Sequence, residues 1–165
     1  MSKFRIEYEC ADSFASLNRE EFFILVHYAN SLNISKARKL YFAGETDYIY
    51  RLENGLPLDG LDFYSSNQPH WNTGDLEDVV SFISMELIPD LESLTNKNLI
   101  ITLGGWPVLK SVIDQGPSYK QRFGIVSEDG LFEDTYEYVY LANSLKDVIM
   151  KSLVLGQPYF INYIE

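Results

Sequence analysis

Two kinds of hydrophobic pattern occur near the start of the chain. From Phe4 to Tyr8 apolar and charged residues alternate, which is typical of a half-buried strand. From Arg19 to Leu32 the apolar positions instead recur on one face of a helix. Asn18 and Glu21 have the spacing of a capping box, in which each side chain binds the other residue's backbone N–H. The pattern therefore predicts a strand followed by a helix.

Helical periodicity returns in two later segments. Thr46 to Glu53 is compatible with a short helix that ends at an Asn-Gly pair. The segment DLEDVVSFISMELIPDLESL, which begins at Asp75, places its apolar residues on one buried stripe. Pro89 is expected to end or kink this second helix, because proline lacks a backbone donor. Residues 34–43 match neither a helix nor a strand clearly.

Short apolar runs separated by Gly and Pro dominate residues 98–130. The runs are Leu99–Leu103, Val108–Ile113 and Phe123–Val126. Because β-branched side chains pack well on a pleated surface, we expect these runs to form antiparallel strands. They are predicted to be the centre of the sheet.

Further strands are predicted on both sides of this centre. The segments are Leu61–Ser65, Thr135–Asn143 and, as an edge strand, Gln157–Ile164. In the second of them Tyr136, Tyr138 and Tyr140 are expected to share one face. A last helix is predicted to begin at Asn143 or Ser144 and to stop at Gly156.

Together these elements predict an α+β fold with a central, mostly antiparallel sheet flanked by helices. The chain has 165 residues, 46% of them hydrophobic, which suits one globular domain spanning residues 1–165. The single cysteine, Cys10, excludes an internal disulfide framework. The first residues do not resemble a secretory signal, and no apolar run approaches the roughly 18–20 residues that span a bilayer. We therefore expect a cytoplasmic protein without a membrane partner.

The net charge of −11, from 24 acidic and 13 basic residues, restricts the possible partners. It argues against direct binding to nucleic acid, which needs a Lys/Arg surface, and against anionic membranes. It would instead attract a basic protein. The one dense basic cluster, Lys36, Arg38 and Lys39, is interpreted as a solvated face that balances nearby acids rather than as a phosphate site.

Motifs for catalysis or metal binding are missing from the sequence. His27 and His70 are the two histidines, and neither lies in a metal-binding spacing or beside a Ser or Cys nucleophile. We therefore predict no catalytic residue, no metal and no cofactor.

The carboxylates form two groups. Nine acidic residues and no Lys or Arg occur between Leu52 and Asn96, and a second group surrounds the turn before the Tyr-rich segment. One interpretation is that these carboxylates are solvated surface charges and helix-capping residues. The alternative is an acidic surface with aromatic anchors that binds a basic protein. The candidate partner-binding residues are Asp59, Asp62, Trp71, Glu128, Asp129, Glu133 and Asp134. Whether the two groups share one face is left open.

Three segments together resemble the SUKH superfamily of immunity-type proteins, which are related to fungal cell-wall synthesis regulators. They are YIYRLENGLPLDGLDFYS (Tyr48–Ser65), NLIITLGGWPVLKSVIDQG (Asn98–Gly116) and YEYVYLANSLKDVI (Tyr136–Ile149). The chain departs from the family near Leu17 to Leu40, where the L-P-x-D/E-Y helix entry is missing. The resemblance implies a central antiparallel sheet and a protein that neutralises a toxin by covering its surface.

Three functions follow as hypotheses. The leading one is a non-enzymatic immunity protein whose acidic surface blocks a basic toxin domain. The second is an anti-defence protein of a phage or mobile element that imitates nucleic acid. The third is a small hydrolase with a pair of carboxylates in a cleft.

Overall fold

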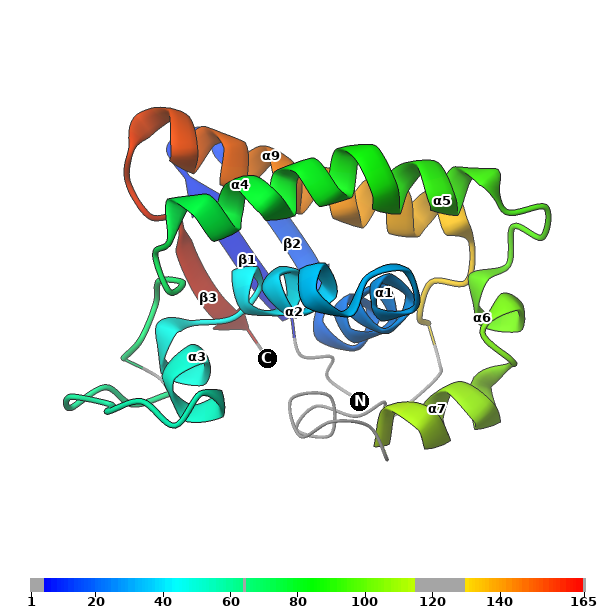
Figure 1. Ribbon diagram of the computed structural model, residues 1–165, viewed down its shortest axis with the longest axis horizontal. Helices are drawn as coiled ribbons and strands as arrows, with labels where there is room; N and C mark the ends of the chain where they lie inside the picture. The colour runs from blue at the N-terminus through cyan, green and yellow to red at the C-terminus, as the bar shows by residue number, and fades with distance from the viewer. Residues whose placement is uncertain (1–4, 64, 115–129, 165) are drawn as a thin grey trace.

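Three antiparallel strands form a small sheet in the order β2-β1-β3. The computed structural model describes residues 5–63, 65–114 and 130–164 of the chain. In it β1 (Arg5–Cys10) pairs with β2 (Ser13–Asn18) on one side and with β3 (Phe160–Ile164) on the other. The predicted first strand and C-terminal edge strand are thereby confirmed. Residues from the two ends of the chain lie side by side in the sheet (Figure 1).

The strand β2 was not predicted. Its sequence, SFASLN, has no β-branched residue, so its composition gives little strand signal. A tight turn with Ala11 at φ 53° connects it to β1. Ala15 and Leu17 are buried beside the buried residues of β1, whereas Phe14 faces solvent and is 57% exposed. The alternation of burial is therefore clear in the structure although the composition hides it.

The first three helices follow the sheet hairpin. They are α1 (Arg19–Leu32), α2 (Ile34–Ala43) and α3 (Asp47–Glu53), so the two predicted helices are confirmed and the ambiguous segment is helical. The side chain of Asn18 caps α1 by accepting hydrogen bonds from the N–H groups of Glu20 and Glu21. The Glu21 carboxylate accepts a hydrogen bond from the distant N–H of Phe132, at 2.7 Å. Glu21 thus connects α1 to the segment before the last helix.

A long helical rod and the last helix form a second layer. α4 (Thr73–Phe82), the π-helical turn η1 (Ile83–Leu87) and α5 (Ile88–Ser93) run end to end, and α9 (Thr135–Leu155) lies alongside them (Figure 1). The rod continues past Pro89 without ending. The π-helical turn η1 lies directly before the proline. It changes the hydrogen-bonding pattern there, so that the missing N–H of Pro89 does not end the helix.

The predicted central strands are wrong wherever the structure describes them. Leu99–Thr102 forms α6 and Trp106–Asp114 forms α7 (Figure 1). Gly104 and Gly105, both with positive φ, make the connection between them. Phe123–Val126 lies outside the described residues. Runs this short fit a helix turn as well as a strand, and here Asn98 caps the first run by accepting from the N–H of Ile101.

Two further predicted strands are also wrong. Residues 61–65 contain no strand where they are described, because Asp62 and Ser65 form a turn. The Tyr-rich segment is the first part of α9 rather than a strand. Tyr138 begins a buried helical stripe, which explains the correction: i, i+3, i+4 and i+7 spacing continues from it along the whole helix. The buried apolar residues of this stripe are Tyr138, Leu141, Ala142, Leu145, Val148 and Ile149.

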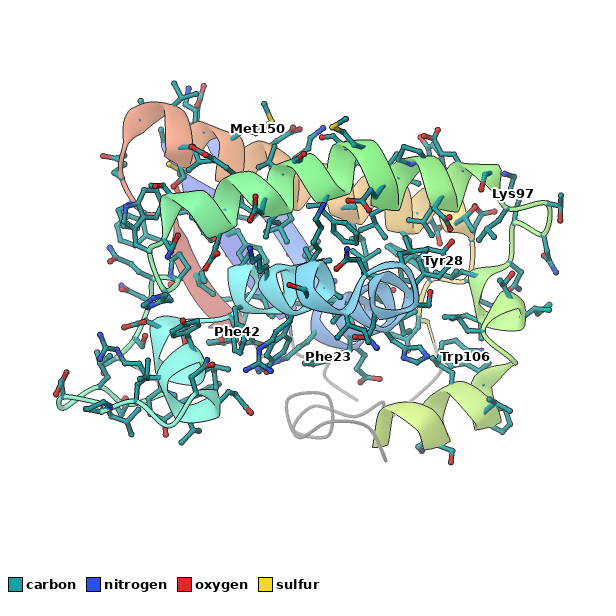
Figure 2. All side chains as sticks on the ribbon, viewed as in Figure 1. Phe23, Tyr28, Phe42, Lys97, Trp106 and Met150 are labelled. Carbon is teal, nitrogen blue, oxygen red and sulfur yellow. The ribbon has the colours of Figure 1, made fainter. Side chains whose placement is uncertain are left out.

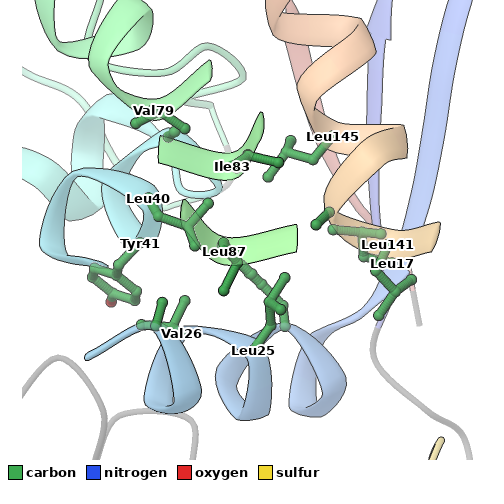
Figure 3. Close-up of a cluster of buried hydrophobic side chains, with 14 of the residues drawn as sticks. Leu17, Leu25, Val26, Leu40, Tyr41, Val79, Ile83, Leu87, Leu141 and Leu145 are labelled. Atoms are coloured by element: carbon green, nitrogen blue, oxygen red, sulfur yellow. The ribbon is translucent and has the colours of Figure 1, made fainter. Parts of the chain in front are cut away.

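One hydrophobic core joins both layers. α9 packs against β1 and β2 on one side and against α4 and α5 on another. Leu25 of α1, Leu40 of α2, Ile83 of the rod and Leu145 of α9 meet in its centre (Figure 3). The protein is therefore a single α+β domain, as predicted, with a sheet made from the two ends of the chain rather than from residues 98–130.

Candidate functional site

The first group of predicted partner-binding residues lies in the loop after α3. Asp59 is exposed, and its Oδ2 lies 3.3 Å from a guanidinium nitrogen of Arg51. Asp62 is also exposed, and its Oδ1 accepts from the N–H of Ser65 at 2.9 Å. The two carboxylates therefore share a loop, in which each already has an intramolecular partner.

The second group lies at the other end of the molecule, between α6 and the start of α9 (Figure 1). Glu133 accepts hydrogen bonds from the Asn98 amide at 3.2 Å and from the Trp106 indole at 3.4 Å. Asp134 caps α9 by accepting from the N–H of Tyr136 at 2.7 Å. Glu128 and Asp129 lie outside the described residues. Asp59 and Asp62 therefore do not form one surface with Glu133 and Asp134.

Trp71 is half-buried and packs against the core rather than projecting as an isolated anchor. It lines a hollow of about 380 Å³ together with Asp47, Arg51 and His70. The structure thus places Trp71 beside a histidine and two charged residues of α3. The sequence spacing of His70 does not predict the two neighbours on α3.

His70 is held in one orientation by two residues of α3. Its Nδ1 lies 2.9 Å from Oδ1 of Asp47, so that this N–H donates to the carboxylate. Its ring stacks on Tyr50, with centroids 3.7 Å apart and planes only 4° from parallel. The second oxygen of Asp47 accepts from Nε of Arg51 at 2.8 Å. The N–H of Asp47 also donates to the carbonyl of Gln68, which fixes the loop that carries His70.

A second hollow, of about 210 Å³, lies on the other side of His70, and we call it the α2–α3 hollow. Its wall includes Arg38, Lys39, Phe42, Tyr50, Asn54 and His70. Figure 2 shows Phe42 between α2 and α3. Phe42 meets Tyr50 edge-on, with ring centroids 5.1 Å apart, and the Arg38 guanidinium lies 5.2 Å from the Phe42 ring centre. The hollow therefore combines an aromatic wall with cationic side chains.

The basic cluster on α2 is partly neutralised, as predicted. Lys36 pairs with Glu86 at 2.7 Å, and Lys39 pairs with Asp75 at 3.4 Å and with Asp78 at 2.6 Å. The contact with Lys39 lowers the pKa of Asp78. These pairs connect α2 to the long rod and account for three of its six acids.

Large apolar side chains are exposed along the outer side of α9. Tyr136 is 76% exposed, Tyr140 65%, Met150 45% and Val154 82%. With Asn143 and Asp147 they follow a regular spacing of four and three residues, so the six positions form one stripe on the helix. We call these six residues the α9 face. Figure 2 shows Met150 at the outer edge of the molecule.

A shallow depression adjoins the C-terminal half of the α9 face. Met150 and Val154 line it together with Asp147 and the tight turn of the sheet hairpin. In that turn Asp12 is paired with Lys151 at 3.1 Å, and the hydrogen bond from Lys151 lowers the pKa of Asp12. The sequence analysis does not identify the α9 face, because it predicts a strand for the Tyr-rich segment. In a strand, Tyr138 would lie on the same side as Tyr136 and Tyr140, whereas in the helix it is buried and they are exposed.

Among the described residues, no group of three His, Cys, Asp or Glu side chains is close enough to hold a metal ion. The same part of the chain contains no helix with the length and apolar character needed to cross a bilayer.

Comparisons of the chain with protein families, curated proteins and solved structures found no match. The segments that resemble the SUKH superfamily also differ from what that resemblance implied. The implied strands of Asn98–Gly116 are helical up to Asp114, and Tyr136–Ile149 is helical throughout.

Proposed function

We propose that the protein is a non-enzymatic binding protein that covers a basic surface of a partner protein with its α9 face. The observation that carries the proposal is the exposure of Tyr136 and Tyr140, at 76% and 65%, on the same face as Met150 and Val154. In the described part of the chain the opposite side of α9 completes the core, so these four side chains do not contribute to it. Their apolar surface is available to a partner.

The composition of the α9 face suits a protein interface. Tyrosine and methionine are enriched in such interfaces, where aromatic side chains supply much of the binding energy. Methionine adapts to irregular surfaces because its side chain is unbranched and flexible. Asn143 and Asp147 interrupt the stripe with polar groups, which favours a partner that supplies hydrogen-bond donors or positive charge.

The charge of the adjacent layer favours a basic partner. Six acidic residues and no Lys or Arg occur between Thr73 and Ser93, in the rod that lies alongside α9, and three of the six pair with lysines of α2. The whole chain carries −11. A complementary basic protein would be attracted before contact, and added salt would slow this association.

More specifically, the proposed partner is a toxin domain, which the protein would neutralise by covering its surface. This part of the proposal comes from the family resemblance, whereas binding to a basic protein rests on the α9 face and the charge. The experiment therefore has to separate the two parts.

The test uses the product of the adjacent gene as the partner. The two proteins are co-expressed and purified, and affinity is measured for the original chain and for the double variant Tyr136→Ala/Tyr140→Ala. We expect the double variant to bind about 10–100-fold more weakly, because aromatic anchors commonly contribute several kcal/mol. Binding should also weaken as salt is raised.

Phe14→Ala is the matched control, because Phe14 is an aromatic residue of similar exposure on the open face of the sheet. It should leave the affinity unchanged. Equal losses in both variants, or full affinity of the Tyr variant, would contradict the use of the α9 face. Full killing by the adjacent gene product during co-expression would contradict toxin neutralisation.

The described carboxylates give less support to the two other hypotheses. A nucleic-acid mimic needs free carboxylates along one surface, but in the rod Asp75, Asp78 and Glu86 pair with lysines and Asp90 binds the Tyr28 hydroxyl. A carboxylate-pair hydrolase needs two acids in one cleft, and each hollow beside His70 is lined by a single carboxylate among the described residues. Asp12 and Asp147 both line the depression beside the α9 face, but that depression is shallow and Asp12 is already paired with Lys151.

A further inference from the structure

The α2–α3 hollow is built from three separate parts of the chain. α2 supplies Arg38 and Phe42, α3 supplies Tyr50 and Asn54, and the loop before α4 supplies His70. Its volume of about 210 Å³ is below the range of roughly 300–1,000 Å³ that is usual for drug-sized ligands. The hollow therefore suits a small molecule of a few ring atoms and one polar group.

One wall of the hollow is aromatic, with its rings in two orientations. The His70 ring lies parallel to Tyr50, Tyr50 meets Phe42 edge-on, and Phe42 is only 9% exposed. Asp47 anchors His70 from behind through Nδ1, which leaves Nε2 as the ring nitrogen that Asp47 does not use. The imidazole is thus positioned before any ligand arrives, so little conformational entropy would be lost on binding.

The rim of the hollow is cationic on a strongly acidic protein. Arg38 donates to the Asn54 side chain at 3.1 Å, and in the described part of the chain no carboxylate forms an ion pair with it. A guanidinium has five N–H donors, so most of those of Arg38 remain available. Lys39 already holds Asp75, which cancels the one carboxylate of the wall. A protonated His70 would add an Nε2–H donor.

We propose that the α2–α3 hollow binds a small molecule that carries an oxyanion, a carboxylate or a phosphate, on a flat apolar ring. The oxyanion accepts hydrogen bonds from Arg38, and from Nε2–H of His70 whenever that nitrogen carries a proton. The ring lies against Phe42 and Tyr50. This site is separate from the α9 face, and the proposal does not depend on partner binding.

The test follows the imidazole signals by nuclear magnetic resonance. The chain has two histidines, so His27 is an internal reference once His70→Gln has assigned the spectrum. The probes are phenyl phosphate, benzoate and inorganic phosphate, all added at the same fixed pH. We expect the two aromatic probes to shift the His70 signals saturably, with a Kd on the order of 1 mM, and to leave His27 unmoved.

Two variants and one comparison decide the result. Arg38→Gln should weaken phenyl phosphate binding at least about tenfold, because a charge-assisted hydrogen bond is lost. Lys110→Gln, an exposed position on α7 at the far end of the molecule, removes the same charge and should have no effect. Inorganic phosphate should bind at least about tenfold more weakly than phenyl phosphate. Unmoved His70 signals, equal losses in the two variants, or equal binding of both phosphates would overturn the proposal.

Discussion

Arg19 and Glu45 form a buried ion pair between the start of α1 and the turn after α2. A guanidinium nitrogen of Arg19 lies 3.0 Å from Oε1 of Glu45, and the two side chains are only 6% and 2% exposed. The Tyr163 hydroxyl of β3 donates to the other oxygen of Glu45 at 2.5 Å, and the guanidinium lies 4.8 Å from the Tyr163 ring centre. The pair thus connects both ends of the chain to the middle of the fold.

Removal of one partner of this pair should strongly destabilise the protein. In Glu45→Ala the Arg19 charge would stay buried without its carboxylate, which typically costs about 3–5 kcal/mol. Urea unfolding followed by circular dichroism measures the free energy of unfolding.

An exposed ion pair provides the control for that measurement. Asp78→Ala removes the partner of Lys39 on the surface, where such pairs contribute about 0–1 kcal/mol. A similar small loss for Glu45→Ala would show that the buried charge finds another partner, which contradicts the structure.

The three tyrosines at the start of α9 should differ sharply when each is changed to alanine. Tyr138 is fully buried and its hydroxyl donates to the carbonyl of Phe132 at 2.7 Å. Tyr138→Ala should therefore cost about 3–5 kcal/mol, as for other buried aromatic residues. Tyr136→Ala and Tyr140→Ala should each change stability by less than about 0.5 kcal/mol, because both side chains are exposed. Equal effects at the three positions would indicate a strand instead of a helix.

Helices in which the apolar pattern repeats several times were predictable from the sequence, and short apolar runs were not. α1 is found at the predicted residues, because fourteen residues give several repeats of the helical pattern. Leu99–Thr102 spans about one turn, so its apolar residues carry no usable period. The sheet was predicted in the wrong place because β2 lacks β-branched residues and because β1 pairs with β3, a strand from the other end of the chain.

The candidate sites show a similar division. An overall acidic surface follows directly from composition, whereas His70 approaches Asp47 and Tyr50 only when the loop folds back on α3. His70 is about twenty residues away from Asp47 and Tyr50 in the sequence, a separation that matches no local motif. The α9 face did have a sequence signal, since Tyr136, Tyr140, Asn143 and Asp147 follow helical spacing. The alternation of the tyrosines concealed it.

Asp134, one of the predicted partner-binding residues, should prove to be structural. Its Oδ1 caps α9, and loss of such a cap costs about 0.5–2 kcal/mol. Asp134→Ala should lower the free energy of unfolding by this amount, whereas Asp134→Asn keeps a capping oxygen and should lower it less. If Asp134→Asn instead abolishes partner binding at full stability, the carboxylate itself contacts the partner.

High pH should unfold the protein through its buried tyrosines. Burial raises the pKa of Tyr8, Tyr138, Tyr159 and Tyr163 above the ordinary value of about 10. Above pH 10 the unfolded chain therefore releases phenolic protons that the folded chain retains. Stability is present below that pH and is lost as the pH rises, by about 1.4 kcal/mol per unit for each such tyrosine. Urea unfolding measured across the alkaline range gives this slope.

The contribution of one tyrosine to this pH dependence of stability can be measured with a variant. Tyr159 is fully buried and donates to the carbonyl of Ala43 at 2.6 Å, so Tyr159→Phe costs about 1 kcal/mol for the lost hydrogen bond at neutral pH. Because this variant has one fewer raised phenol, its stability should fall less steeply above pH 10 than that of the original chain. Tyr136→Phe, at an exposed position, should leave the slope unchanged. An identical slope for Tyr159→Phe and the original chain would mean that the Tyr159 phenol ionises as readily in the folded protein as in the unfolded chain.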